Sequence, residues 1–472
     1  MKLTLSELRP IATIDPRFQS YNVEMIEVTG GRFWAPYAVM VAEGELYHER
    51  APVDLENPVL RRFAAALGPA YVRVSGTWAN STYFCDSDPP PEAPPPGFGG
   101  VLTHQQWQDV IDFAAAVDAE IVTSVAMSDG TRDPQGHWQP DQLRRILAAT
   151  RHGGGKIAGI EFMNEPSARA GAPAGYDAVA YARDFRAFCD TLRELSPQTL
   201  IAGPSALGDR LDDPNEPELA ARRLLEQPGG ADLDVLSYHH YGAASRRCAD
   251  DTWWQQTRAQ DALGEDWLGR TAQSFGVYRA LRDRFMPGKP IWLTETADTV
   301  CGGNPWASTF LDSFRYLDQL GRLARDGVAV VMHNTLAASD YGMIDETTLA
   351  PRPNYWCALL WRRLMGSTVF DCGAPVPGFH VYTHSLRDQV EGKAVLALNT
   401  DRTKEQALDL PVPSRRYTLT AKEPQARALM LNGAPLQVSP DGRLPPLVPE
   451  TTPSGRLRLP PASVTFLEIR AE

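Results

Sequence analysis

The chain has 472 residues, of which 43% are hydrophobic, so it can bury a large core and form more than one domain. Acidic residues outnumber basic ones by 58 to 46, and the net charge of −12 argues against a nucleic-acid ligand and against attraction to an acidic membrane surface. No apolar run reaches the roughly 18–20 residues of a membrane span, and residues 1–7 lack the apolar segment of a signal peptide, so we expect a soluble protein with neither feature.

From about residue 20 to 365, apolar segments typical of buried strands alternate with amphipathic segments typical of helices. The predicted strands are 20–28, 70–75, 119–125, 157–163, 199–203, 234–239, 290–295 and 328–333. Helices are expected between them, for example at 104–118, 176–195 and 305–326. Eight such units predict an α/β fold, a closed (β/α)8 TIM barrel over residues 15–366.

Beyond the barrel the pattern changes to short alternating segments separated by proline and glycine. They include 379–382, 394–398, 417–420 and 464–469. This pattern predicts a second, smaller domain over residues 367–472, an antiparallel β-sandwich, to which residues 1–14 could add a strand.

Two glutamates stand at the ends of predicted barrel strands, where the active site of such a barrel forms. Asn164 and Glu165 follow the strand 157–163, and Glu295 closes the strand 290–295. A pair of carboxylates is what hydrolysis of a glycosidic bond needs. We assign Glu165 as the acid and later base, Glu295 as the nucleophile, and Asn164 as a partner of a sugar 2-hydroxyl. The alternatives are a surface or capping role for Glu165 and a structural ion pair for Glu295.

These two roles require different protonation states, so the surroundings must separate the two pKa values. We expect charge repulsion from Glu295 to help keep Glu165 protonated. A buried carboxylate also needs hydrogen-bond donors, and Tyr241, at the end of the preceding strand, is the candidate donor to Glu295.

The adjacent histidines 239 and 240 do not form a metal pair, because neighbouring residues of a strand point to opposite faces. We expect His239 to line the substrate site and His240 to pack behind it, or the reverse. No glycine-rich phosphate loop follows a strand, and no G-x-S-x-G turn is present. We therefore predict neither a metal ion nor a cofactor.

The six cysteines show no metal-binding spacing. They are either independent thiols, or Cys248 and Cys301 form a disulfide between neighbouring loops at the rim of the barrel. The sequence leaves both possibilities open.

The chain resembles glycoside hydrolase family seventy-nine, the heparanase and β-glucuronidase group, in its bacterial heparanase form. The similarity covers nearly the whole length. It is carried by the segments 71–77, 80–83, 164–166, 239–241, 295–296 with the glycines at 302–303, 354–356, 429–433, 444–447 and 459–461.

The resemblance implies a retaining mechanism through Glu165 and Glu295, with further residues around the sugar. Glu24 and Thr77 would contact sugar hydroxyls. The carboxylate of a uronic acid would be held by Gly302, Gly303 and Tyr341. Contacts to sulfated sugars would come from Arg210 and Arg246, for which the alternative is an ordinary solvated surface position.

Two departures from animal heparanases are visible. Only Trp78 and Ala79 separate Thr77 from Asn80, where those enzymes carry a long excised linker, so we expect no proteolytic activation. The lysines that flank the Asn-Ser-Thr-Tyr segment in those enzymes are also missing.

The sequence therefore predicts a monomeric endo-β-glucuronidase that cleaves heparan sulfate, a glycosaminoglycan. An exo-acting β-glucuronidase is the alternative, and a non-catalytic polysaccharide-binding protein is an alternative of another class. Such a polymer lies outside cells, so extracellular or periplasmic action is expected, although no leader is visible.

Overall fold

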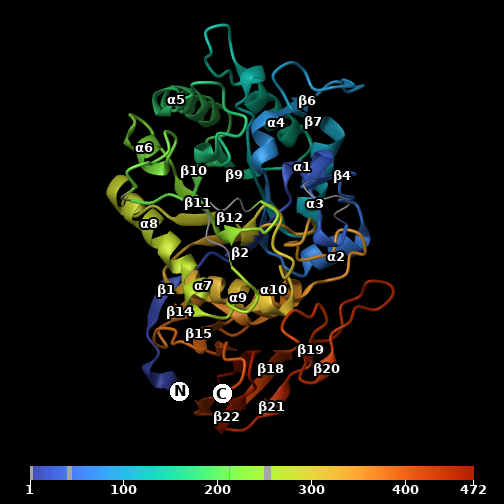
Figure 1. The fold of residues 1–472 in the computed structure, drawn as a ribbon, viewed down its shortest axis with the longest axis vertical. Helices are drawn as coiled ribbons and strands as arrows, with labels where there is room; N and C mark the ends of the chain where they lie inside the picture. The colour runs from blue at the N-terminus through green and yellow to red at the C-terminus, as the bar shows by residue number, and fades with distance from the viewer. Residues whose placement is uncertain (1–3, 40–44, 212, 249–256, 472) are drawn as a thin grey trace.

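The computed structural model describes residues 4–39, 45–211, 213–248 and 257–471, and its centre is a closed barrel of eight parallel strands (Figure 1). The barrel strands are β2 (Gln19–Asn22), β5 (Ala70–Val74), β8 (Ala119–Ser124), β9 (Ile157–Glu161), β10 (Leu200–Leu207), β11 (Val235–Ala244), β12 (Ile291–Val300) and β13 (Val330–His333). The last strand pairs with the first, which closes the barrel and confirms the predicted fold class.

Helices and small two-stranded sheets surround this barrel. The helices are α1 (Met25–Thr29), α2 (Pro58–Ala65), α3 (His104–Ala116), α4 (Asp141–His152), α5 (Ala178–Leu195), α6 (Ala221–Glu226), α7 (Glu265–Leu268), α8 (Arg270–Phe285), α9 (Phe310–Arg325) and α10 (Pro353–Leu364). Five 3-10 turns add η1 (Leu5–Glu7), η2 (Tyr37–Val39), η3 (Thr77–Ser81), η4 (Asp129–Thr131) and η5 (Pro166–Ala168). Two small sheets outside the barrel pair β3 (Gly31–Trp34) with β4 (Tyr47–Arg50) and β6 (Thr82–Cys85) with β7 (Gly100–Thr103).

The first predicted strand is shorter than the sequence suggested. Residues 20–28 were expected to be one strand, but β2 ends at Asn22 and α1 begins at Met25. The cause is local, because the carboxylate of Glu27 accepts a hydrogen bond from the backbone N–H of Glu24 at 2.7 Å and caps the helix start. This early turn places Glu24 at the mouth of the barrel instead of within a strand.

The inside of the barrel is filled by side chains and is not a pore. Tyr71 and Trp292 lie with their ring centroids 5.0 Å apart, in a buried cluster with small and branched residues of the other strands. The buried charged side chains of Arg73, Glu161 and Glu295 lie nearer the C-terminal ends of the strands, where a TIM barrel forms its active site.

The C-terminal part is an antiparallel sheet packed below α9 and α10 (Figure 1). Its strands are β1 (Pro10–Thr13), β14 (Met365–Phe370), β15 (Phe379–Leu386), β16 (Lys393–Asn399), β18 (Ser414–Thr420), β19 (Met430–Leu431), β20 (Ala434–Pro435), β21 (Glu450–Thr452) and β23 (Ser463–Ile469). A second layer consists of β17 (Gln406–Leu410) and β22 (Gly455–Leu459), with leucines such as Leu408 and Leu457 packed between the layers.

Two features concern the proposed division of the chain. The N-terminal strand β1 pairs with β14 in the C-terminal sheet, and the boundary placed between residues 366 and 367 falls inside β14. The division into two domains therefore stays a prediction. Within the described residues, no helix has both the length and the apolar character needed to span a membrane.

Candidate active site

Glu295 faces the barrel axis because β12 is irregular at this point. Leu293 pairs with Tyr238 of β11, but the next aligned pair is Glu295 with His239, so β12 carries one extra residue here. Leu293 belongs to the core outside the barrel, and regular alternation would turn Glu295 outward as well. A bulge of this kind re-aims side chains, and it turns this carboxylate inward.

Glu165 follows β9 and lies opposite Glu295. Its backbone adopts a left-handed conformation with φ of 45°, and its N–H donates to the carbonyl of Ser205 at 3.1 Å. The preceding peptide is held on both sides by Asn80, whose amide accepts from the Asn164 N–H and donates to the Asn164 carbonyl, each at 2.9 Å. The sharp turn at Glu165 is thus fixed by its neighbours.

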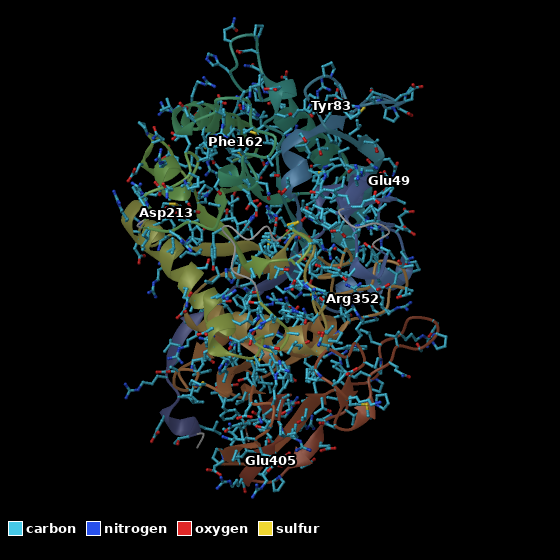
Figure 2. All side chains as sticks on the ribbon, in the orientation of Figure 1. Glu49, Tyr83, Phe162, Asp213, Arg352 and Glu405 are labelled. Carbon is cyan, nitrogen blue, oxygen red and sulfur yellow. A yellow bond between two sulfur atoms is a disulfide. The ribbon has the colours of Figure 1, made fainter. Side chains whose placement is uncertain are left out.

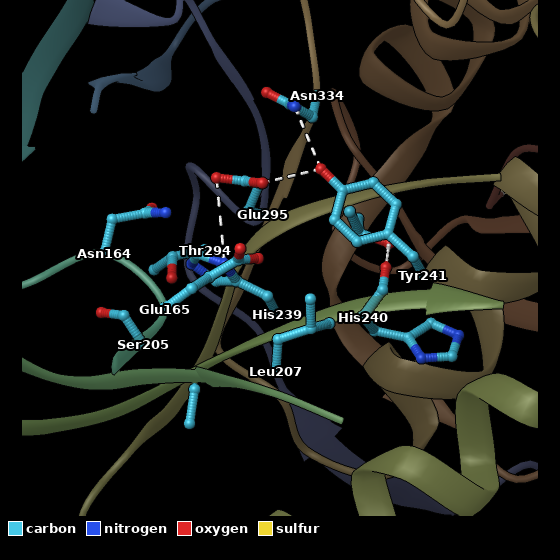
Figure 3. Close-up of polar contacts among 12 residues, drawn as sticks. Asn164, Glu165, Ser205, Leu207, His239, His240, Tyr241, Thr294, Glu295 and Asn334 are labelled. Carbon is cyan, nitrogen blue, oxygen red and sulfur yellow. Dashed lines mark hydrogen bonds and ion pairs between the residues drawn. The ribbon is translucent and has the colours of Figure 1, made fainter. Parts of the chain in front are cut away.

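The two carboxylates and His239 meet in one place (Figure 3). The His239 Nδ1 lies 2.9 Å from an oxygen of Glu165 and 3.8 Å from an oxygen of Glu295. At least one oxygen of Glu165 lies within 4.8 Å of one of Glu295. Figure 3 shows His240 pointing away from this group, as expected for neighbours on a strand.

Arg73 of β5 is buried beneath the carboxylates and contacts both sides of the site. Its guanidinium donates to Glu295 at 2.8 Å, to Asn164 at 2.7 Å and to Glu161, which is fully buried, at 2.8 Å. Burial lowers the pKa of Arg73, but Glu161 and Glu295 outweigh that effect and raise it. The guanidinium is therefore a fixed positive charge at the base of the site.

Glu295 has a second donor on its other oxygen. The Tyr241 hydroxyl donates to Glu295 at 2.7 Å, so the predicted contact is present. Asn334, which follows β13, donates to the Tyr241 hydroxyl at 3.0 Å and to Glu24 at 2.9 Å. Glu24 lies over Gly76, where a Cβ would come within 1.9 Å of its carboxylate, and burial together with the charge of Glu295 raises the pKa of Glu24.

The pKa values of Glu165 and its neighbour His239 are shifted in opposite directions. Burial raises the pKa of Glu165 to about 7, opposed by Arg73 and assisted by Glu161. The cause is thus mainly desolvation, and the assisting charge is that of Glu161 and not of Glu295, which corrects the repulsion expected from the sequence. Burial lowers the pKa of His239 to about 4, so this ring is neutral at pH 7.

The neutral His239 ring has a defined tautomer. Its Nε2 lies 3.3 Å from an Arg73 nitrogen, and arginine can only donate, so Nε2 accepts and the proton resides on Nδ1. The Nδ1–H then donates to Glu165. His239 therefore orients the Glu165 carboxyl whether that group is protonated or ionised.

The glycines at 302 and 303 form a buried turn after β12 with φ of 80° and 90°, values that favour glycine. A Cβ on Gly303 would come within 3.1 Å of the Tyr341 N–H nitrogen. The carbonyl of Gly303 accepts from Ser245 at 2.7 Å and from the Arg247 guanidinium at 3.3 Å, and Arg247 also pairs with Asp340 at 2.5 Å. Tyr341 is buried, and its hydroxyl accepts from Asn334 at 3.3 Å.

The remaining predicted residues lie at the same end of the barrel but not in the buried cluster. Thr77 is exposed at the start of η3, directly after Gly76. Arg210 and Arg246 are exposed on the loops after β10 and β11. The structure thus brings Glu165, Glu295, Asn164, His239, Tyr241, Glu24 and Tyr341 together and leaves these three at the rim.

Cys248 and Cys301 form a disulfide with a Cα–Cα distance of 6.4 Å, which decides between the two possibilities left open by the sequence. The bond joins the loop after β11 to the loop after β12, one residue before Gly302. The other four cysteines are free thiols.

Comparison with known proteins identifies the family. Residues 52–321, more than half of the chain, match the family model described as Glycosyl hydrolase family 79, N-terminal domain. The chain belongs to glycosyl hydrolase family 79. The heparanase of Mus musculus is 25% identical over 522 residues, covering 98% of this chain and 91% of that protein. Heparanase-like protein 1 of Arabidopsis thaliana is 25% identical, covering 74% of this chain and 65% of that protein, so the chain spans just under two thirds of that relative.

The fold is shared with solved glycosidase structures. A 4-O-α-L-rhamnosyl-β-D-glucuronidase from Fusarium oxysporum superposes with a TM-score of 0.68 over 99% of this chain and 100% of the other, at 12% identity. The chain thus belongs to a glycoside hydrolase family and shares its fold with a solved glycosidase.

Several residues of the family 79 site were not singled out from the sequence. They are Asn22, Arg73, Glu161, Arg247 and Asn334. A signal existed for Arg73, because a charged residue between Val72 and Val74 in a buried strand must have charged partners. The same signal marked Glu161, which stands between Ile160 and Phe162 in the predicted strand 157–163, whereas none marked the other three.

The Glu165, His239 and Glu295 ligand atoms are close enough to hold a metal ion. Arg73 contacts both Glu295 and His239, however, and its positive charge already balances the carboxylates at this point. The donor set therefore does not favour a cation.

Proposed function

We propose that this protein is a retaining endo-β-glucuronidase that hydrolyses internal glucuronide linkages of heparan sulfate or a similar glycosaminoglycan. The observation that carries the proposal is that one carboxylate oxygen of Glu165 lies within 4.8 Å of one of Glu295. Retaining glycosidases hold their two carboxyl groups about 5–5.5 Å apart, whereas inverting ones leave roughly 6.5–9.5 Å for a water molecule. The spacing supports double displacement.

In the first step an oxygen of Glu295 attacks the anomeric carbon, and the bond to the leaving oxygen breaks. Glu165, protonated because burial raises its pKa to about 7, gives its proton to that oxygen. Arg73 and Tyr241 hold the two oxygens of Glu295 and aim the attacking one. The products are a glycosyl ester on Glu295 and an ionised Glu165.

In the second step the ionised Glu165 takes a proton from water, and the hydroxide oxygen bonds to the anomeric carbon. The ester bond breaks, and Glu295 leaves as a carboxylate. Three buried polar atoms are candidates for hydrogen bonds with sugar hydroxyls. Asn164 Nδ2, Glu24 Oε2 and Asn334 Oδ1 have no hydrogen-bond partner among the described residues.

The substrate class rests on the family and on the turn at Gly302 and Gly303, whose close approach to Tyr341 supports a site for a uronic acid carboxylate. Arg210 and Arg246 at the rim support contacts with sulfate groups further along the chain. Internal and terminal cleavage share this chemistry and differ in whether loops close the cleft beyond the terminal sugar, so their products differ.

The test combines active-site variants with product analysis. Glu295→Gln should lower kcat on a chromogenic β-glucuronide by several orders of magnitude, and Glu165→Gln should lower it by roughly 10²–10⁴-fold on a substrate that needs protonation. Glu405→Gln, an exposed glutamate at the far end of the C-terminal sheet (Figure 2), is the matched control and should leave kcat unchanged.

Heparan sulfate digested by the wild-type enzyme should yield a range of oligosaccharides, and proton NMR should show the β-anomer formed first. Free glucuronic acid as the only product would establish the exo-acting alternative. Activity that survives Glu295→Gln unchanged would instead favour a site in which this residue is structural.

A further inference from the structure

A cluster of half-buried aromatic rings lies on the hairpin formed by β3 and β4. Trp34 of β3 and Tyr47 of β4 are paired across the hairpin, with ring centroids 4.5 Å apart. Trp78 of η3 stands nearly edge-on to both, at 6.4 Å and with interplanar angles of 82° and 85°. All three side chains are only partly buried, whereas Phe33 behind them is fully buried.

These rings continue the apolar wall of the active site. Trp34 and Trp78 pack against the same buried cluster that contains Tyr241 and Tyr341. The Trp34 Cβ lies directly on Gly302, so close that a Cβ there would come within 2.6 Å of it, and Trp78 directly follows Thr77 at the rim. The aromatic surface therefore adjoins the proposed uronate site, and the two meet at Trp34 and Gly302.

The base of the hairpin is fixed to the rim of the barrel. The backbone carbonyl of Ala35 accepts from the Arg247 guanidinium, and the N–H of Tyr37 donates to Asp340 at 3.0 Å. The Tyr37 ring lies 4.0 Å from the Arg247 guanidinium, and its hydroxyl is 2.9 Å from that of Ser245. The buried pair of Arg247 and Asp340 thus joins the hairpin to the Gly303 turn, which preorganises the rings relative to the catalytic carboxylates.

We propose that Trp34, Tyr47 and Trp78, here called the aromatic platform, bind the sugar ring next to the one whose glycosidic bond is cut. A pyranose ring presents C–H groups on its faces, and large aromatic side chains gain free energy by covering such apolar surface. Partly exposed tryptophans and tyrosines beside a polar site are typical of ligand contacts. The inference rests on the proposed glycosidase function and adds a residue-level determinant of chain-length preference.

The test compares a substrate that reaches the platform with one that does not. A heparan sulfate hexasaccharide carries neighbouring rings, whereas β-D-glucuronosyl fluoride carries none, and both can be assayed with the full chain. For Trp78→Ala and for Tyr47→Ala, the ratio of kcat/KM for the hexasaccharide to kcat/KM for the fluoride should fall by roughly tenfold.

Matched variants separate binding from folding. Trp78→Phe and Tyr47→Phe keep a ring and should retain most of the wild-type ratio. Tyr83→Ala removes a half-buried tyrosine of β6 (Figure 2), whose ring packs 5.2 Å from that of Phe98, and should leave the ratio unchanged. If an alanine variant does not fold, tryptophan fluorescence of Glu295→Gln is recorded with and without the hexasaccharide. A fluorescence change on binding that is absent when Trp78→Phe is added supports the platform, and a change that persists unaltered overturns it.

A wild-type ratio in Trp78→Ala and Tyr47→Ala, with both substrates turned over, would overturn the platform. So would an equal loss on both substrates, because that is the behaviour of a merely structural cluster. A wild-type enzyme that hydrolyses neither substrate would instead contradict the proposed function, so the two failures are distinguishable.

Discussion

The guanidinium of Arg73 connects residues from most of the barrel. It reaches Asn22 of β2, Glu161 of β9, His239 of β11 and Glu295 of β12. A buried charge of this kind is stable only when its partners surround it, so each of these strands must be in register before the site exists. The catalytic geometry therefore depends on closure of the barrel and not on any single loop.

Ionisation of the proposed acid, Glu165, should set the basic limb of the pH dependence of the reaction. Its pKa of about 7 means that the acid form needed for the first step is present below that pH and is lost as the pH rises through it. We expect kcat/KM on an alkyl β-glucuronide to fall with a limb near pH 7. A pH–rate profile measures this directly.

Glu165→Gln should remove that basic limb from whatever activity remains. Glu405→Gln should keep it. If kcat/KM of the wild-type enzyme already fell with rising pH below pH 5, the assignment would be contradicted. Glu165 would then ionise as an ordinary exposed glutamate does.

The proximity of the two proposed catalytic residues was predictable from the sequence for a physical reason. Glu165 and Glu295 stand at the ends of apolar strands, and the topology of a parallel barrel brings such positions together. The partners that tune them were less readable, because hydrogen bonds between distant strands leave no local pattern. Asn334 is an example, since its contacts with Glu24 and Tyr241 span most of the chain.

At the scale of elements, the rim is built from loops that follow β11 and β12. The disulfide joins Cys248 to Cys301. The neighbouring Arg247 contacts the β3–β4 hairpin through Ala35, and Gly302 belongs to the glycine turn. The covalent bond thus holds the loops after β11 and β12 at a fixed separation.

Removing this bond should weaken both the fold and substrate binding. For the double variant Cys248→Ser, Cys301→Ser, we expect the free energy of unfolding to fall by about 2–4 kcal/mol. We also expect a higher KM for a β-glucuronide, because the Gly302 turn becomes less ordered. Denaturant titration and steady-state kinetics measure the two effects.

Cys189→Ser, which changes a free thiol on α5, is the control and should alter neither quantity. Wild-type enzyme in strong reductant should behave like the double variant. Unchanged unfolding and unchanged KM under reduction would show that the bond has no such role.

The strands were the most predictable elements, because a parallel sheet buried on both faces leaves continuous apolar runs. Two local deviations were not predictable. The sequence 20–28 is apolar enough for a strand, but Glu24 and Glu27 start a helix inside it. The bulge that turns Glu295 inward depends on the register of β12 with β11, and no residue in β12 indicates that register.

At the scale of the whole molecule, the barrel and the C-terminal sheet meet at a buried charged group. His380 of β15 lies between Asp318 of α9, at 2.6 Å, and Glu265 of α7, at 2.5 Å. Asp318 also accepts from Tyr382 and pairs with Arg322. Burial lowers the pKa of His380, but the hydrogen bond and charge of Asp318, with Glu265, outweigh it and raise the pKa above its ordinary value.

This contact should make stability depend on pH. Because the folded state raises the pKa of His380, its contribution is fully present below the unfolded pKa of about 6.5 and is lost as the pH rises through the folded value. We therefore expect His380→Gln to lower the free energy of unfolding more at pH 6 than at pH 9. Denaturant unfolding at both values measures the difference.

His137→Gln, at an exposed position, serves as the control and should show little effect at either pH. A His380→Gln effect that is equal at the two pH values, or larger at pH 9, would mean that the protonated ring does not bridge the two carboxylates.

The pairing of β1 with β14 has a consequence for synthesis. Pro10–Thr13 leaves the ribosome first, yet its partner Met365–Phe370 emerges only after the last barrel strand. Throughout that interval the early segment presents unpaired backbone groups of the kind that recruit chaperones or other chains. A bulky protein fused directly ahead of Pro10 would therefore lie beside an edge strand whose partner is synthesised more than 300 residues later.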